Sequence, residues 1–211
     1  MCFNYKVSLL TFLIGTVSSL ILIKKGNAKY NTENIIFGIF LIFISSIQFM
    51  DFLFWIDLSN KMGINHITTL IGPLLNIGQP VILYLIKLMY FYDSVINDIN
   101  IYDSGVFILN LFYFIFLIKA YLQFLSNEKL VTSTSHGILK WPWIKYSSTL
   151  FYMVLLVVNI FYLTNFKYSL YIFLITYFFL YLSYRFFSYN ISELWCVFGA
   201  FIPIAIMILT V

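Results

Sequence analysis

Seven long stretches of this chain contain at most one charged side chain each, and they constrain the fold more than any other feature. A helix needs about 20 residues to cross the hydrocarbon core of a bilayer, because that core is about 30 Å thick and a helix rises about 1.5 Å per residue. The stretches are apolar throughout, whereas the strands of a membrane barrel would alternate apolar and polar residues. We therefore expect an all-α fold, a polytopic membrane protein with a bundle of about seven transmembrane helices.

The low charge of the chain supports this fold class. Charged residues make up 9% of the sequence, whereas a soluble domain carries roughly 25% because water must wet its surface. We expect residues 1–211 to form a single transmembrane domain with no soluble domain beside it. The expected spans are Val7–Ile23, Asn34–Ile56, Ile67–Phe91, Val106–Phe124, Ser147–Leu163, Tyr168–Phe187 and Ile191–Val211.

The basic residues leave the orientation of the chain in the membrane open, but they bear on its partners. They fall almost evenly on the two sides of the expected bundle, seven on one and five on the other, so the orientation stays open. They occur singly or in pairs, which does not suit a nucleic-acid surface. The expected partner is the lipid bilayer, and the oligomeric state stays open. The first span is longer than the apolar core of a secretory signal, about 7–15 residues, so we expect it to be retained.

The second span carries a polar stripe. Its members are Ser45, Gln48, Asp51 and Trp55, and their spacing of three, three and four residues places them on one face of a helix. Most other side chains of this span are Ile, Phe, Leu and Met. We expect the stripe to face the interior of the bundle, because a polar group facing lipid has no partner.

The third span should be kinked near its middle. Pro80 lacks an amide hydrogen and clashes with the preceding turn, which frees the carbonyl of Asn76. Gly78 lies beside it, and Gln79 lies at the edge of the same polar face. Kinks of this kind occur in channels and transporters, but they also serve as plain packing devices. The packing interpretation is the one that we favour for the kink.

Two further patterns are expected to be contact surfaces or anchors. The first span presents Ser8, Thr11, Gly15 and Ser18 on one face, and the last presents Ser192, Cys196, Gly199 and Pro203, so that neighbouring helices can approach closely. The Trp141-Pro142-Trp143 triplet lies between Lys140 and Lys145 in the longest connection. Indole rings beside lysine are typical of anchors at the membrane interface.

The sharpest site hypothesis concerns Asp51. The expected topology places it near one membrane face together with Arg185 and Glu193, and we expect it to pair with Arg185 or to bond Gln48 and Gln79 in a polar vestibule. The alternative is a single buried pair that only stabilises the bundle. Glu193 also fits a capping box at the start of the last span. The candidate residues are Gln48, Asp51, Asn76, Gln79, Arg185, Glu193 and Cys196.

Several chemistries are disfavoured. A retinal protein needs a lysine in its last span, and Ile191–Val211 contains none. A zinc-dependent membrane hydrolase needs three histidines, whereas His66 and His136 are the only two and both lie outside the spans. No phosphate loop or dinucleotide motif is present. We expect no catalytic residue, no cofactor and no metal, and an enzyme is disfavoured, although lipid chemistry by Asp and Arg is left open.

Three short motifs resemble those of an uncharacterised family. They are Met1-Cys2 leading into Val7-Ser8-Leu9, Gln79-Pro80 in the third span, and Leu194-Trp195-Cys196 at the start of the last. The family comprises short seven-helix membrane proteins encoded by large DNA viruses and scattered microbes. The resemblance covers the whole chain. Since the family has no assigned activity, the resemblance implies only that the Gln-Pro kink and the Trp-Cys start of the last helix are shared by its members.

Two functions remain open. In the first, the second, third and seventh helices line a pathway for a small solute or an ion, with polar side chains at successive depths that include Asn110 and Asn159. In the second, the bundle is receptor-like, structural or rhodopsin-like without chromophore, and its polar residues serve packing only. A water-accessible funnel that reaches Gln79 would favour the first.

Overall fold

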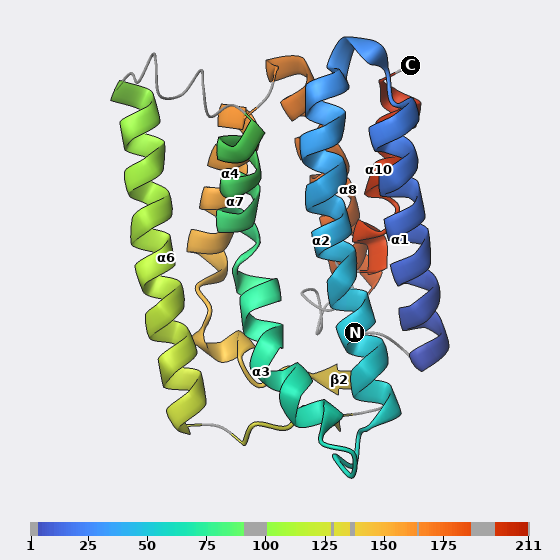
Figure 1. Ribbon diagram of the computed structural model, residues 1–211, viewed down its shortest axis with the longest axis vertical. Helices are drawn as coiled ribbons and strands as arrows, with labels where there is room; N and C mark the ends of the chain where they lie inside the picture. The colour runs from blue at the N-terminus through green and yellow to red at the C-terminus, as the bar shows by residue number, and fades with distance from the viewer. Residues whose placement is uncertain are drawn as a thin grey trace.

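The computed structural model describes residues 4–90, 101–127, 129–135, 138–163, 165–186 and 197–210. Most of these residues are helical, and successive long helices run in alternating directions along one axis (Figure 1). The expected all-α fold is confirmed, with a short hairpin added at one end. The elements are α1 (Tyr5–Lys25), η1 (Ala28–Tyr30), α2 (Asn31–Ile56), α3 (Ile64–Ile77), α4 (Gln79–Tyr90), α6 (Ile101–Asn127), β1 (Ser133–Ser135), β2 (Ile138–Lys140), η2 (Ile144–Tyr146), α7 (Thr149–Leu163), α8 (Phe166–Phe186) and α10 (Ile202–Leu209).

Four of the described helices are long and apolar enough to cross a membrane, which is compatible with a membrane protein. They are α1, the continuous segment Ala28–Ile56, α6 and α8. The bent pair of α3 and α4 makes a fifth if it counts as one span. α7 and the segment Val197–Leu209 are apolar but shorter than the other spans. The described residues thus include four such helices, or five with the bent pair, where the sequence predicted seven spans.

The outer surface of the molecule is rich in large apolar side chains. On α6, Phe112 is 62% exposed and Ile115 is 56% exposed, and Phe107 and Leu122 are exposed beside them. A monomer in water rarely leaves so continuous an apolar surface uncovered. Lipid is the solvent that suits this surface, in agreement with the low charge of the chain.

The first two long helices form the tightest pair. α1 packs along α2 over most of its length (Figure 1). Its small residues Ser8, Thr11, Gly15 and Ser18 are all buried, so the predicted contact face of the first span is confirmed. The approach is closest at Gly15, where a Cβ atom would lie 2.2 Å from the Oγ of Ser45. The absence of a side chain at Gly15 thus sets the distance between the two helices.

The predicted kink in the third span is also confirmed. α3 ends at Ile77, α4 begins at Gln79, and the two helices are bent by 65° relative to each other. Pro80 cannot donate a hydrogen bond to the preceding turn. Side chains of neighbouring helices supply donors at the break. The hydroxyl of Tyr113 in α6 donates to the carbonyl oxygen of Ile77 at 2.8 Å. The side-chain amide of Asn159 in α7 donates to the carbonyl oxygen of Pro80 at 2.8 Å.

The connection between α6 and α7 folds back into the end of the bundle. β1 and β2 pair antiparallel, with Ser133 opposite Lys140, and the chain then enters the space between α2 and α3. We call Leu130–Tyr146 the plug loop. The expectation that its tryptophans are interfacial anchors is wrong, because Trp141 and Trp143 are only 4% and 2% exposed.

The hydroxyl of Tyr113 gives a test of how the break is held. Leaving a buried carbonyl without its donor costs about 1–3 kcal/mol, so we expect Tyr113→Phe to lower the free energy of unfolding by that amount. The measurement is unfolding by SDS in mixed micelles, followed by circular dichroism. Tyr181→Phe is the control, since this ring is 52% exposed and its change should stay below about 0.5 kcal/mol. Equal losses in both variants would contradict this account of the break.

Candidate functional site

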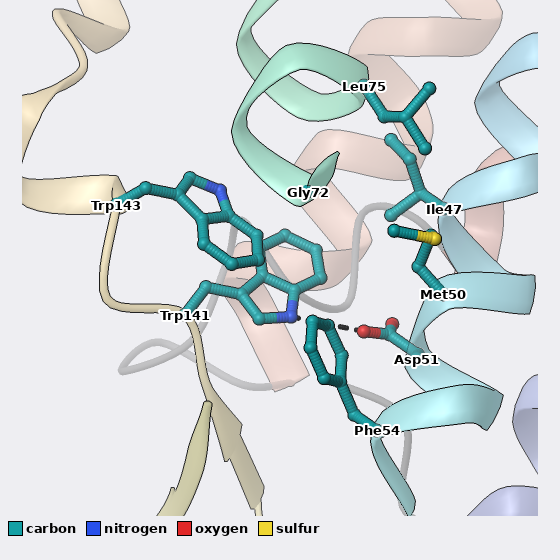
Figure 2. A pocket seen from close by; sticks show the side chains of 8 residues that line it. All are labelled: Ile47, Met50, Asp51, Phe54, Gly72, Leu75, Trp141 and Trp143. Atoms are coloured by element: carbon teal, nitrogen blue, oxygen red, sulfur yellow. Dashed lines mark hydrogen bonds between the residues drawn. The ribbon is translucent and has the colours of Figure 1, made fainter. Parts of the chain in front are cut away.

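Of the charged residues of the predicted site that the structure describes, Asp51 is the buried one. Its side chain is 0% exposed, in the last third of α2. The indole N–H of Trp141 donates to its Oδ1 at 3.0 Å, from a position 90 residues later in the chain (Figure 2). Two other members of the stripe, Ser45 and Gln48, are buried as well. The predicted inward orientation of this stripe is thereby confirmed for these three residues.

The two indoles of the plug loop lie flat against each other. Their centroids are 5.5 Å apart and their planes differ by 14°. The rings of Phe54 in α2 and Phe124 in α6 each lie 6.2 Å from the Trp143 ring. At Gly72 of α3, a Cβ atom would lie 2.4 Å from Trp143 Cη2. The ring therefore fits directly against the backbone of α3, which explains why this tryptophan enters the bundle.

A small cavity lies between the indoles and the two helices (Figure 2). Asp51, Trp141 and Trp143 line it, together with apolar side chains of α2 and α3 such as Met50 and Leu75. It has room for about one water molecule. Trp143 differs from its neighbour in one respect: its indole N–H has no hydrogen-bond partner among the residues described.

Neutral hydrogen bonds attach the start of the plug loop to the first turns of α3. Thr132 donates its N–H to Asn65 Oδ1 at 2.8 Å and accepts from Asn65 Nδ2 at 2.9 Å. The hydroxyls of Thr132 and Thr69 lie 2.9 Å apart. The ring of His66 bonds the carbonyl oxygen of Leu130 at 2.9 Å. These contacts fix where the loop leaves α6 and thereby direct its tryptophans toward Asp51.

Asp57, which follows α2, holds the start of α3 in place. Its carboxylate accepts hydrogen bonds from the backbone N–H groups of Met62, Ile64 and Asn65 at 3.2, 2.9 and 3.3 Å. Burial raises the pKa of this carboxyl, but the backbone hydrogen bonds outweigh burial and leave the pKa below its ordinary value of 3.8. Asp57 is therefore ionised near neutral pH and supports the helix to which the plug loop is attached.

The other predicted site residues lie in different places. Gln79 is buried at the α3–α4 break, where its Oε1 accepts a hydrogen bond from the Tyr152 hydroxyl. Asn76 is half-buried, and Arg185 is exposed near the end of α8. Of the predicted residues that the structure describes, Asp51 is the one that lines the cavity. The hydrogen bond that the structure describes to Asp51 comes from Trp141, which the hypothesis had not named as a partner.

Gln48 has its own partner, since its Oε1 accepts from the hydroxyl of Thr11 in α1 at 2.9 Å. Glu193 and Cys196 lie outside the residues that the structure describes, as does the proposed cap at Asn190. The contact face predicted for the last span is therefore visible only at Gly199, which is buried, and at Pro203, also buried.

Two further polar groups are present. Asn110 and Asn159 exchange two amide hydrogen bonds of 3.0 Å between α6 and α7, close to the break. Near the opposite end of the bundle, Lys87 donates to the carbonyl oxygen of Tyr162 at 2.9 Å and lies 3.4 Å from the centroid of its ring. The Tyr162 hydroxyl donates to Asp103. Sequence reasoning named both amides but not this second cluster, because Lys87 and Asp103 lie on different helices.

No protein-family model, curated protein or solved structure matches the chain. The candidate site is therefore defined by its geometry alone.

The two indoles form a matched pair for testing the bond to Asp51. A hydrogen bond to a charged group contributes about 1.5–3 kcal/mol, so Trp141→Phe should lower the free energy of unfolding by that amount. Trp143→Phe loses a similar ring volume but removes an N–H that has no described partner, so its cost should be smaller than that of Trp141→Phe by about 1.5–3 kcal/mol, the contribution of the bond. Both variants keep an aromatic ring. The measurement is SDS unfolding, repeated in an Asp51→Asn background, where the excess cost of Trp141→Phe should shrink. An equal cost of the two tryptophan variants would disprove the importance of the bond.

Proposed function

We propose that this chain is a seven-pass integral membrane protein with an ion pathway through its bundle, and that Asp51 is the ion-binding group. The observation that carries the proposal is the complete burial of the Asp51 carboxylate beside a cavity. A charge inside a membrane helix is costly, up to about 2.5–3.5 kcal/mol at the helix centre on insertion scales, and Asp51 is buried in the last third of α2. Packing alone would favour an apolar residue at this position. A carboxylate makes a cation the expected ion.

The arrangement of the helices supports seven passes. The directions of the helices alternate along the chain (Figure 1), so the bent pair and the two short apolar segments fit as crossings. α7 has 15 residues, a length of about 22 Å, and its approach through η2 adds to the distance covered. Broken helices occur at membrane depth where protein or a pathway surrounds them. The break at Gly78 is such a place.

The resemblance to the seven-helix family of large DNA viruses remains a proposal as well. In its support, Gln79-Pro80 coincides with the break between α3 and α4. The motifs at Met1-Cys2 and at Leu194-Trp195-Cys196 lie outside the residues that the structure describes.

A second candidate function has observations in its favour. Buried polar side chains form separate pairs, such as Gln48 with Thr11 and Asn110 with Asn159, rather than one continuous row. The described cavity holds about one water molecule and is lined by Asp51, not by Gln79. A structural or receptor-like bundle would look like this. The same features also fit a pathway in its closed state.

Topology is tested by thiol labelling in a background of Cys2→Ser and Cys196→Ser. We expect Lys129→Cys and Asn165→Cys, which flank α7, to react with a membrane-impermeant maleimide from opposite sides of the membrane. Asn60→Cys should react from the side of Lys129→Cys. The measurement is labelling in sealed vesicles before and after permeabilisation. Labelling of both α7 flanks from the same side would rule out the seven-pass arrangement.

The pathway is tested by electrical currents from purified protein in liposomes on a solid-supported membrane. Jumps in proton, sodium, potassium or ammonium concentration should give a current with the wild type for at least one cation, and at least tenfold less with Asp51→Asn. Glu33→Gln, at the opposite end of α2, is the control and should keep the current. Currents no larger than in protein-free liposomes, combined with a loss of stability in Asp51→Asn, would favour the packing function.

A further inference from the structure

We propose that Lys87, Tyr162 and Asp103 form a second proton-binding site of the ion pathway, and that the cation carried by the pathway is a proton. The inference rests on the proposed ion pathway, because it names the ion and adds a site away from Asp51. Lys87 belongs to α4, Asp103 to α6 and Tyr162 to α7. We call these three residues the lysine cluster.

The lysine cluster joins three helices around a buried ammonium group. Lys87 is 9% exposed, and its Nζ donates to the backbone carbonyl oxygen of Tyr162 at 2.9 Å. The same nitrogen lies 3.4 Å from the centroid of the Tyr162 ring. The hydroxyl of that ring donates to the carboxylate of Asp103. One tyrosine therefore contacts a basic and an acidic side chain at once, and its hydroxyl can both donate and accept a hydrogen bond.

The lysine cluster lies at the end of the bundle opposite to Asp51. Lys87 is three residues before the end of α4, Asp103 is two residues after the start of α6, and Tyr162 is the last residue but one of α7. These helix ends lie at the top of Figure 1, whereas the end of α2 that carries Asp51 lies at the bottom. A buried ionisable side chain is thus present near each end of the bundle.

Polar side chains of the same three helices lie between the two ends. Asn110 in α6 and Asn159 in α7 exchange amide hydrogen bonds of 3.0 Å. Asn110 comes seven residues after Asp103, about 10 Å further along the helix. Tyr84, almost one turn before Lys87 in α4, is buried and is close enough to Asp103 for an electrostatic interaction. Groups that can form hydrogen bonds therefore occur at several depths, which a route for protons requires.

The charges of the lysine cluster favour a proton over a metal cation. The ammonium group of Lys87 would repel a sodium or potassium ion beside Asp103. A proton instead forms an O–H bond with the carboxylate, which turns Asp103 into a neutral acid and adds no second cation. When this bond breaks and the proton leaves, the charge of Asp103 acts on Lys87 again. The lysine cluster can thus load and release a proton without room for a hydrated ion.

The experiment measures proton flux into liposomes that contain the purified protein and a pH-sensitive dye. A potassium gradient with valinomycin drives the flux. We expect Asp103→Asn to lower the rate by about tenfold or more, because an amide cannot take up the proton. Asp103→Glu should keep most of the flux, since a carboxyl group remains. The control is Lys167→Gln, which changes an exposed lysine at the start of α8 and should leave the rate unchanged.

A double variant separates a role in flux from a role in stability. Asp103→Asn alone removes a negative charge near a buried ammonium group, whereas Lys87→Met with Asp103→Asn removes both charges, a change that is often neutral or stabilising. We expect the double variant to unfold in SDS with a free energy close to that of the wild type and still to lack the flux. Normal stability combined with normal flux would overturn the proposal, because the lysine cluster would then serve packing only.

Infrared difference spectra between acidic and alkaline pH detect the proton on Asp103 directly. The band of a protonated carboxyl group should appear in the wild type at acidic pH, and part of it should be missing in Asp103→Asn. A spectrum that this substitution leaves unchanged would show that Asp103 takes up no proton, which would overturn the site whatever the flux.

The second site and the pathway fail in different ways. If Asp51→Asn abolishes a proton flux that Asp103→Asn leaves unchanged, the pathway stands and the second site is wrong. If a sodium or potassium current depends on Asp51 while no proton moves, the pathway stands and the ion inferred here is wrong. If no cation moves but the carboxyl band of Asp103 is found, the ion pathway is wrong and the proton-binding site stands.

Discussion

The hydrogen bond from Trp141 to Asp51 joins the two halves of this molecule. The carboxylate lies among Phe54, Met50 and other apolar side chains, where water cannot replace a missing partner, so its donors must come from the protein. The donor that the structure describes comes from the connection between α6 and α7, which folds back into the bundle. Hydrogen bonds to α3 hold that connection in position. The start of α3 is in turn held by the backbone N–H groups that donate to Asp57. One buried charge thus explains a chain of contacts that would otherwise look unrelated.

The same rule operates at the α3–α4 break, with neutral groups. Pro80 removes a backbone donor, and the hydroxyl of Tyr113 and the amide of Asn159 supply donors to nearby carbonyl oxygens. These side chains come from α6 and α7, so the break orders the packing of two further helices. The two places differ in charge. The hydrogen bonds at the α3–α4 break join neutral groups, whereas the carboxylate of Asp51 can exchange its hydrogen-bond donor for a cation.

Sequence reasoning succeeded where the signal was local. The periodicity of Ser45, Gln48 and Asp51 predicted the buried face of α2, and Pro80 beside Gly78 predicted the bend. It failed where the partner was remote: nothing near Asp51 points to a residue 90 positions later. Trp141 was misread because tryptophan beside lysine is usual at an interface, and the space left by Gly72 is a property of the packed helices. The number of spans is harder to predict than their presence, since α7 is short although its sequence is as apolar as the others.

The order of residues along the chain has a consequence for how the protein is made. The helices that line the cavity beside the two indoles, α2 and α3, come early in the chain, whereas Trp141 is synthesised only after α6. During synthesis, which proceeds from the N-terminus at about 5–20 residues per second, Asp51 must therefore wait several seconds for its indole partner. In that interval the nascent helix hairpin carries Asp51 without the indole N–H that donates to it in the folded protein.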